Sequence, residues 1–256
     1  MERFTEISRE KWKFPPTCNR SGKTRGPNDI KEVIRLESDL FAVPTIIMSD
    51  LHSHTGAIFE RLDREIDLSR YIVLTAGDMA AAEPIFGYDG DPTEFYEFMA
   101  QKAGQFYFVQ GNHDLPPANP KRLKSMKNSV GKKCYIEDAE TVMTEVGMIG
   151  GINGTVSDKK HPYKKTHEEF YRQVDHLFKR PVRIFITHET PSYELVMDDG
   201  VKRELVGQPL LYEKVVKKRP VVHIYGHCHH PRAINFLKGV YFLNVDSRIL
   251  IIEPRP

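Results

Sequence analysis

The chain has 256 residues, 40% of them hydrophobic and 28% charged, and its 37 Lys and Arg residues nearly balance its 35 Asp and Glu residues. This length suits one globular domain with a substantial core, and a net charge of +2 does not demand a polyanionic partner, although local basic patches stay open. No apolar run approaches the ~20 residues of a membrane helix, and the charged N-terminus lacks the apolar core of a signal peptide. Three cysteines without a disulfide-framework spacing favour a reducing compartment, so we expect a cytoplasmic or nuclear protein that does not enter a membrane.

Residues 1–40 differ in composition from the rest of the chain. The segment 15–28 is rich in turn-forming and basic residues, which predicts that residues 1–40 form an extension that lies on the surface or is partly mobile. Residues 41–256 then form the main domain. The triplet Gly22-Lys23-Thr24 does not predict a Walker loop, because Thr17 stands where that loop needs a glycine.

From residue 43 onward, short apolar runs recur, and each run ends in a polar cluster. Near-continuous apolar runs of this length are typical of strands that are buried on both faces. The predicted strands are 44–48, 71–75, 106–109, 183–186 and 221–225.

Helix signals fall between these strands. Asp91-Pro92-Thr93-Glu94 has the capping residue, early proline and glutamate of a helix start, and Thr166 with Glu169 predicts a capping box. Strands that alternate with helices indicate an α/β fold. Segments 141–152 and 240–250 have no helix between their strand candidates and predict an added antiparallel portion.

The polar clusters share residue types that bind metal ions. In open α/β sheets, functional groups gather beyond the carboxyl ends of the strands, so we expect these clusters to lie together. Oxygen and imidazole donors suit two divalent ions such as Mn, Fe, Zn, Ni or Mg, rather than a thiolate-rich structural zinc site. The candidate metal ligands are Asp50, His52, Asp78, Asn112, His188, His227 and His229.

These clusters occur in the order found in a known family. Asp50-Leu51-His52, Gly77-Asp78, Gly111-Asn112-His113-Asp114, His188 and Gly226-His227-Cys228-His229 resemble the five blocks of the calcineurin-like metallophosphoesterases. The resemblance covers residues 43–230. It implies a four-layer α/β/β/α sandwich of two mixed sheets flanked by helices, with the metal site at the carboxyl ends of the strands.

The resemblance also implies a role for each ligand. One metal ion would be held by Asp50, His52 and His229, the other by Asn112, His188 and His227, and Asp78 would bridge them. A carboxylate bridge relieves the repulsion between two cations, and the pair of ions makes a hydroxide available for in-line attack on phosphorus.

Two further residues are candidate catalytic groups. His113 would protonate the leaving-group oxygen or stabilise its charge. Asp114 would orient the His113 imidazole, as carboxylates do in catalytic dyads.

The residues that follow the second block restrict the class of substrate. Ser/Thr protein phosphatases of this superfamily carry an arginine and a second aspartate just after Gly-Asp, whereas Met79 and three alanines follow Asp78 here. The chain is therefore similar to the phosphodiesterase-like branch. We expect a metal-dependent phosphoric ester hydrolase that acts on a small phosphodiester or a nucleotide-type ester.

Two alternative functions stay open. Basic residues in 121–133 and 159–165 are compatible with a nuclease that binds RNA or DNA, but a solvated basic loop is the favoured explanation of 121–133, because this segment lacks aromatic residues for base stacking. A non-catalytic scaffold of the same fold is the second alternative, and the complete ligand set argues against it. The sequence leaves the oligomeric state open.

Overall fold

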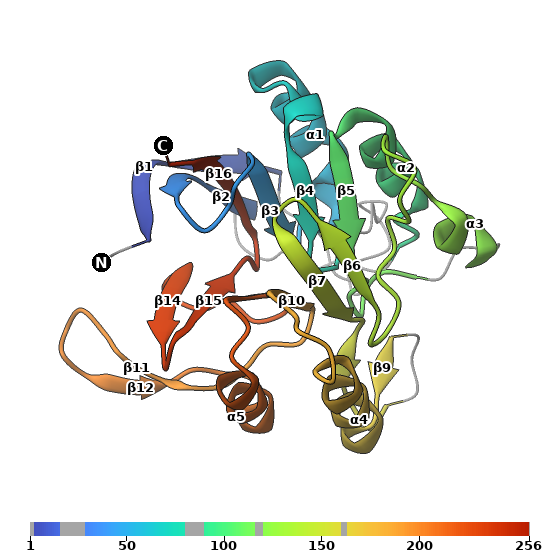
Figure 1. Ribbon diagram of the computed structural model, residues 1–256. Coiled ribbons are helices and arrows are strands. Elements are labelled where there is room, and N and C mark those ends of the chain that lie inside the picture. Colours follow the sequence, from blue (N-terminus) through green and yellow to red (C-terminus); the bar gives the residue numbers. More distant parts are fainter. Residues whose placement is uncertain (1–2, 16–28, 80–89, 116–119, 160–162, 256) are drawn as a thin grey trace.

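The computed structural model describes residues 3–15, 29–79, 90–115, 120–159 and 163–255. Two mixed sheets of six strands each form its centre (Figure 1). The first sheet contains, in spatial order, β1 (Phe4–Phe14), β2 (Asp29–Ser38), β16 (Arg248–Pro254), β3 (Thr45–Ser49), β4 (Ile72–Thr75) and β5 (Gln105–Phe108). The second contains β14 (Ile234–Leu237), β15 (Val240–Asn244), β13 (Val222–Tyr225), β10 (Ile184–Thr187), β7 (Gly147–Ile152) and β6 (Thr141–Thr144).

Helices cover the outer face of each sheet. The helices α1 (Thr55–Glu65) and α2 (Thr93–Lys102) lie against the first sheet, and α4 (His167–Leu177) and α5 (Pro209–Lys218) lie against the second (Figure 1). Three apolar clusters fill the spaces between these layers, and the middle cluster joins the inner faces of the two sheets. The predicted four-layer α/β/β/α sandwich is therefore confirmed. The remaining elements are η1 (His52–His54), η2 (Leu68–Arg70), α3 (Pro120–Ser125), β8 (Thr155–Val156), β9 (Lys164–Lys165), β11 (Glu194–Val196) and β12 (Lys202–Glu204).

The parallel strands have their carboxyl ends at one edge of the molecule. The strands β3, β4 and β5 are parallel neighbours in the first sheet, and β7, β10, β13 and β15 are parallel in the second. All five predicted strands are present among them. Their loops therefore meet where the two sheets face each other.

The N-terminal segments differ from the predicted surface extension. Strand β2 is an inner strand of the first sheet, between β1 and β16, and its Val33, Ile34 and Leu36 are buried. Five charged residues are interspersed with these apolar residues in β2, which gives the strand the composition of a surface segment. The triplet Gly22-Lys23-Thr24 lies outside the described residues, and the domain boundary at residue 40 stays a prediction.

The C-terminal portion also differs in detail. Segment 141–152 forms the predicted antiparallel pair β6–β7, but segment 240–250 divides between the two sheets. Strand β15 is parallel to β13, while β16 crosses to the first sheet and lies antiparallel to β3. Within the described residues, none of the helices has the length and apolar character needed to cross a bilayer.

Candidate metal centre

The candidate ligands stand one to four residues beyond the carboxyl ends of parallel strands. Several of them have a left-handed backbone, which residues other than glycine rarely adopt. The φ angles are 56° at Asp50, 50° at His52, 54° at Asp78 and 69° at His227. The loops after β3, β4 and β13 thus make sharp turns, which hold these side chains at the carboxyl edge of the sheets.

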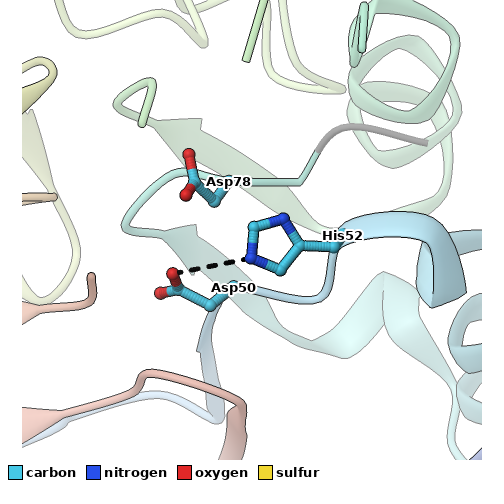
Figure 2. Close-up of side chains that lie close together, drawn as sticks. All are labelled: Asp50, His52 and Asp78. Carbon is cyan, nitrogen blue, oxygen red and sulfur yellow. Dashed lines mark ion pairs between the residues drawn. The ribbon is translucent and has the colours of Figure 1, made fainter. Parts of the chain in front are cut away.

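Asp50, His52 and Asp78 form the tightest group (Figure 2). One ligand atom of each residue lies within 4.8 Å of the others, and His52 Nε2 is 3.9 Å from Asp50 Oδ1. His188 approaches Asp78 from the second sheet, with 3.1 Å between its Nε2 and Asp78 Oδ2. Asp78 therefore lies between the Asp50–His52 pair and His188, as a bridging carboxylate would.

A second group of candidate ligands consists of Asn112, His188 and His227. The Nδ1 atom of His188 lies 2.7 Å from the carbonyl oxygen of Ala76, which fixes a proton on Nδ1, so Nε2 is the nitrogen that would bind a metal ion after losing its own proton. Within the described part of the chain, Asn112 Oδ1 is buried without a hydrogen-bond partner, while the buried His188 Nε2 faces the Asp78 carboxylate. The ring of His227 lies 5.3 Å from that of His188, centroid to centroid. A buried acceptor without a donor fits a cation.

The electrostatics of the buried carboxylates also fit a cation site. Burial raises the pKa of Asp50 well above its ordinary value, and repulsion from Asp246 adds to this effect. Burial also opposes ionisation of Asp78, but attraction to His188 and His52 holds its pKa below the ordinary range. His188 is buried too, yet Asp78 and Asp50 raise its pKa to about 10. These carboxylates therefore stabilise positive charge in the centre.

Bonds from backbone and hydroxyl groups fix the carboxylates. Asp50 Oδ2 accepts hydrogen bonds from Ser49 Oγ at 2.6 Å and from the amide of His227 at 3.1 Å. The buried Lys31 donates its amine to the carbonyl oxygen of Asp50 at 2.9 Å. Lys31 and Ser49 were not singled out from the sequence, since nothing in their local pattern distinguishes them.

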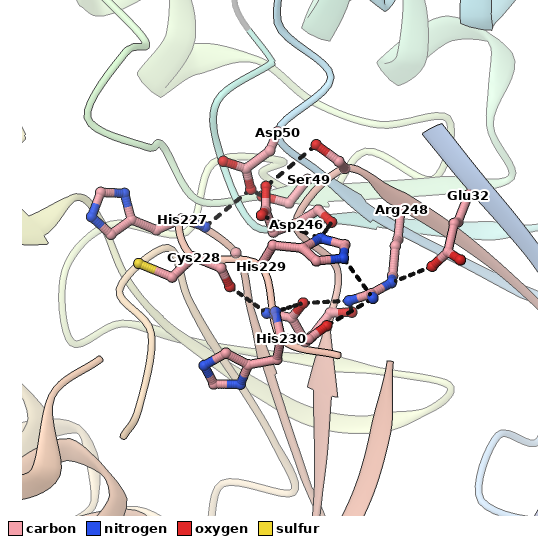
Figure 3. A network of polar contacts seen from close by, with 12 residues as sticks. Glu32, Ser49, Asp50, His227, Cys228, His229, His230, Asp246 and Arg248 are labelled. Atoms are coloured by element: carbon pink, nitrogen blue, oxygen red, sulfur yellow. Dashed lines mark hydrogen bonds and ion pairs between the residues drawn. The ribbon is translucent and has the colours of Figure 1, made fainter. Parts of the chain in front are cut away.

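His229 does not join the Asp50–His52–Asp78 group. Its side chain is 53% exposed, and its Nδ1 lies 3.2 Å from the carbonyl oxygen of Asp246 (Figure 3). Its Nε2 lies 3.0 Å from Arg248 Nη2. Both ring nitrogens thus face the segment that follows β15, and metal binding by His229 stays a prediction. Asp246 could have been suspected, because it too follows the carboxyl end of a parallel strand.

His113 lies beside the centre, as expected for a candidate catalytic group. Its backbone amide donates to Asp78 Oδ1 at 2.8 Å, and its ring centroid is 5.5 Å from that of His52. The imidazole is therefore a neighbour of the His52 ring.

Asp114 has partners other than the predicted one. Its Oδ2 accepts from the amides of Asp78 at 2.9 Å and Gly111 at 2.8 Å, and its Oδ1 accepts from the amide of Met79 at 2.9 Å. The Tyr96 hydroxyl also donates to Oδ2, at 3.3 Å. Asp114 thus holds together the loop after β4 and the loop after β5. None of these contacts involves the His113 imidazole, so its orientation by Asp114 stays a prediction.

Three of the six basic residues of segment 121–133 form ion pairs with acidic neighbours that the structure describes. Arg122 pairs with Glu97, and Lys124 and Lys133 both pair with Glu137. These contacts reduce the positive charge available to a polyanion.

Comparisons with known proteins agree with this geometry. A family model described as "Calcineurin-like phosphoesterase" matches residues 43–231. The solved structure of TT1561 of Thermus thermophilus is similar at 13% identity with a TM-score of 0.55, over 80% of this chain and 90% of that chain. A second solved structure is 11% identical with a TM-score of 0.50, over 79% of this chain and 90% of that chain. At such identities the solved structures support the fold alone. No curated protein matches the chain.

Proposed function

This chain belongs to the calcineurin-like phosphoesterase family, and we propose that it is a two-metal enzyme that hydrolyses small phosphodiesters or nucleotide-type phosphate esters. The observation that carries the proposal is the position of Asp78, between His188 on one side and the Asp50–His52 pair on the other. A buried carboxylate with imidazoles on both sides is suited to bridge two cations.

The proposed assignment of ligands is the one that the family resemblance implies. Asp50, His52 and Asp78 would hold the first ion. Asn112, His188 and His227 would hold the second, with Asp78 shared, and His229 would contribute to the first ion if its ring turned from Arg248. Two divalent ions bound there supply activation of a water molecule and stabilise charge on the phosphoryl oxygens. We propose Mn as the native metal, with Fe, Ni, Zn and Mg as alternatives, since hard oxygen donors and imidazoles accept all of them.

The protein's own groups position the substrate and handle the leaving group. The His113 ring lies 5.5 Å from that of His52, centroid to centroid, and would donate a proton to the departing oxygen of a bound ester. Residue 79 is a buried methionine rather than an arginine that would clamp a monoester dianion. This substitution supports a diester over a protein phosphomonoester.

A panel of substrates and metals tests the proposal. Nitrophenyl diesters, cyclic and linear nucleotide diesters, monoesters and pyrophosphates are assayed separately with Mn, Ni, Mg and Zn. We expect the highest kcat/KM for a diester with Mn. Faster hydrolysis of monoesters would contradict the phosphodiesterase assignment, and absence of metal-dependent hydrolysis across the panel would favour a scaffold.

The nuclease alternative has a separate test. The acidic partners of Arg122, Lys124 and Lys133 argue against a continuous nucleic-acid surface on segment 121–133. Binding of RNA and DNA is measured over a salt titration. Strong binding at low salt that weakens steeply as salt rises would restore the nuclease hypothesis.

A further inference from the structure

Arg248, the first residue of β16, is a buried arginine with partners in three distant segments (Figure 3). Its Nε donates to Glu32 Oε2 at 2.8 Å. Its Nη2 donates to the carbonyl oxygen of His230 at 2.8 Å and faces His229 Nε2 at 3.0 Å. A buried guanidinium is stable only when its donors are satisfied, so these contacts fix its position.

Asn244, the last residue of β15, completes the attachment of Arg248 to the same loop. It accepts a hydrogen bond from Arg248 Nη1, and its Oδ1 also accepts from the amide of His230 at 3.1 Å. Its Nδ2 donates to the carbonyl oxygen of Cys228 at 2.9 Å. Arg248 and Asn244 together therefore hold the backbone of loop 227–230 on both sides of His229.

This loop needs external support. His227 has a φ of 69°, a left-handed conformation that a histidine does not favour by itself. The same residue donates its backbone amide to Asp50 Oδ2 and places its ring beside His188. A shift of the loop would therefore disturb both halves of the metal centre.

We propose that Arg248 is a positioning residue of the metal centre, which holds the backbone of loop 227–230 so that His227 is placed to bind metal. The inference rests on the proposed metal site. Arg248, Asn244 and Glu32 all lie outside the family-matched residues 43–231. The chain thus supports the shared site with segments that the family match does not include.

The Glu32 partner allows a structural role to be separated from a positioning role. Glu32→Gln weakens the buried ion pair and leaves every contact between Arg248 and the loop in place. Glu32→Gln/Arg248→Met removes both charges together, so that no buried charge is left unpaired, but it also removes the loop contacts. The comparison of these two proteins isolates the contribution of Arg248 to the loop. Arg232→Met is the matched control, because Arg232 is partly exposed and pairs with Asp198.

Two measurements on the full chain test the proposal. Calorimetric titration with MnCl₂ should give a Kd at least tenfold weaker for Glu32→Gln/Arg248→Met than for Glu32→Gln, while Arg232→Met stays within twofold of the wild type. Hydrogen exchange without metal should be faster at the amides of residues 227–230 in the double variant than in Glu32→Gln. Equal Kd values, or equal exchange in the loop, would overturn the proposal. Because neither measurement uses a substrate, a wild-type protein that binds Mn²⁺ but hydrolyses no ester contradicts the proposed function alone.

Discussion

The carboxylate of Asp114 accepts the backbone amide of Asp78 at 2.9 Å. The same carboxylate accepts the amides of Met79 and Gly111, so it joins the loop after β4 to the loop after β5. The candidate bridging residue is therefore aimed by its own backbone, which a buried neighbour holds in place.

Asp114→Asn should destabilise the protein by about 1–3 kcal/mol, because an amide group can accept at only one of its two ends and would turn a donor towards a buried N–H. Displacement of Asp78 should also weaken Mn²⁺ binding. Urea unfolding and metal titration check both effects. Asp175→Asn on the exposed face of α4 is the control and should change stability by less than about 0.5 kcal/mol. An unchanged unfolding free energy in Asp114→Asn would contradict this structural role.

Gly111→Ala should impair metal binding through direct contact. An added Cβ would lie 2.0 Å from Asp78 Oδ1, so the carboxylate must move away from its position between the two ligand groups. We expect a loss of roughly 1–3 kcal/mol in stability and Mn²⁺ binding weakened at least tenfold. Gly56→Ala in α1 is the matched control, since an added Cβ there meets nothing within 4 Å. That variant should gain about 0.4–1 kcal/mol and bind Mn²⁺ normally. Similar metal affinities in the two variants would refute the prediction.

His113→Ala should separate catalysis from metal binding. The contact of His113 with Asp78 uses the backbone amide, which alanine retains. Loss of the imidazole should lower kcat about 10²–10⁴-fold if it transfers a proton to the leaving group. Metal content is measured alongside turnover of a nitrophenyl diester, with His176→Ala on the exposed face of α4 as the control. Normal turnover in His113→Ala would remove this residue from the catalytic machinery.

His223→Phe should reduce the acid sensitivity of the fold. Burial lowers the pKa of His223 to about 3, whereas the unfolded chain titrates near 6.5, so between these values the unfolded state binds the extra proton. Stability from a neutral His223 is therefore complete above pH 6.5 and is lost as pH falls towards 3, by about 1.4 kcal/mol per pH unit at most.

Phenylalanine keeps the stacking on Phe185 and cannot titrate. Urea unfolding at pH 7.5 and pH 5 should show the wild type losing about 2 kcal/mol more than His223→Phe on acidification. The same loss in both proteins would show that His223 does not contribute.

The strands and the ligand clusters were predictable because their signals are local. An apolar run followed by Asp50 or Asp78 marks the end of a buried strand and the start of a polar loop. The order of these clusters then indicated both the family and the sandwich fold. These parts of the molecule depend on short stretches of sequence.

Other parts depend on contacts that leave no local signal. Glu32 and Arg248 are separated by 216 residues in the sequence. Each is a charged residue that sequence alone would place on the surface, because its buried partner is not visible in the local pattern. The partners of Asp114 are mainly backbone amides, which are the same for every residue type. The orientation of His229 follows from Asp246 and Arg248 rather than from the motif that contains it.

The left-handed backbone at four candidate ligands implies a conflict between thermostability and metal binding; these residues are Asp50, His52, Asp78 and His227. Glycine at such a position would relieve on the order of 1 kcal/mol of strain and would remove a candidate metal ligand. A library of variants selected only for survival on heating should thus lose the candidate ligands at these positions first. Engineering of a heat-resistant form must therefore select for metal retention together with melting temperature.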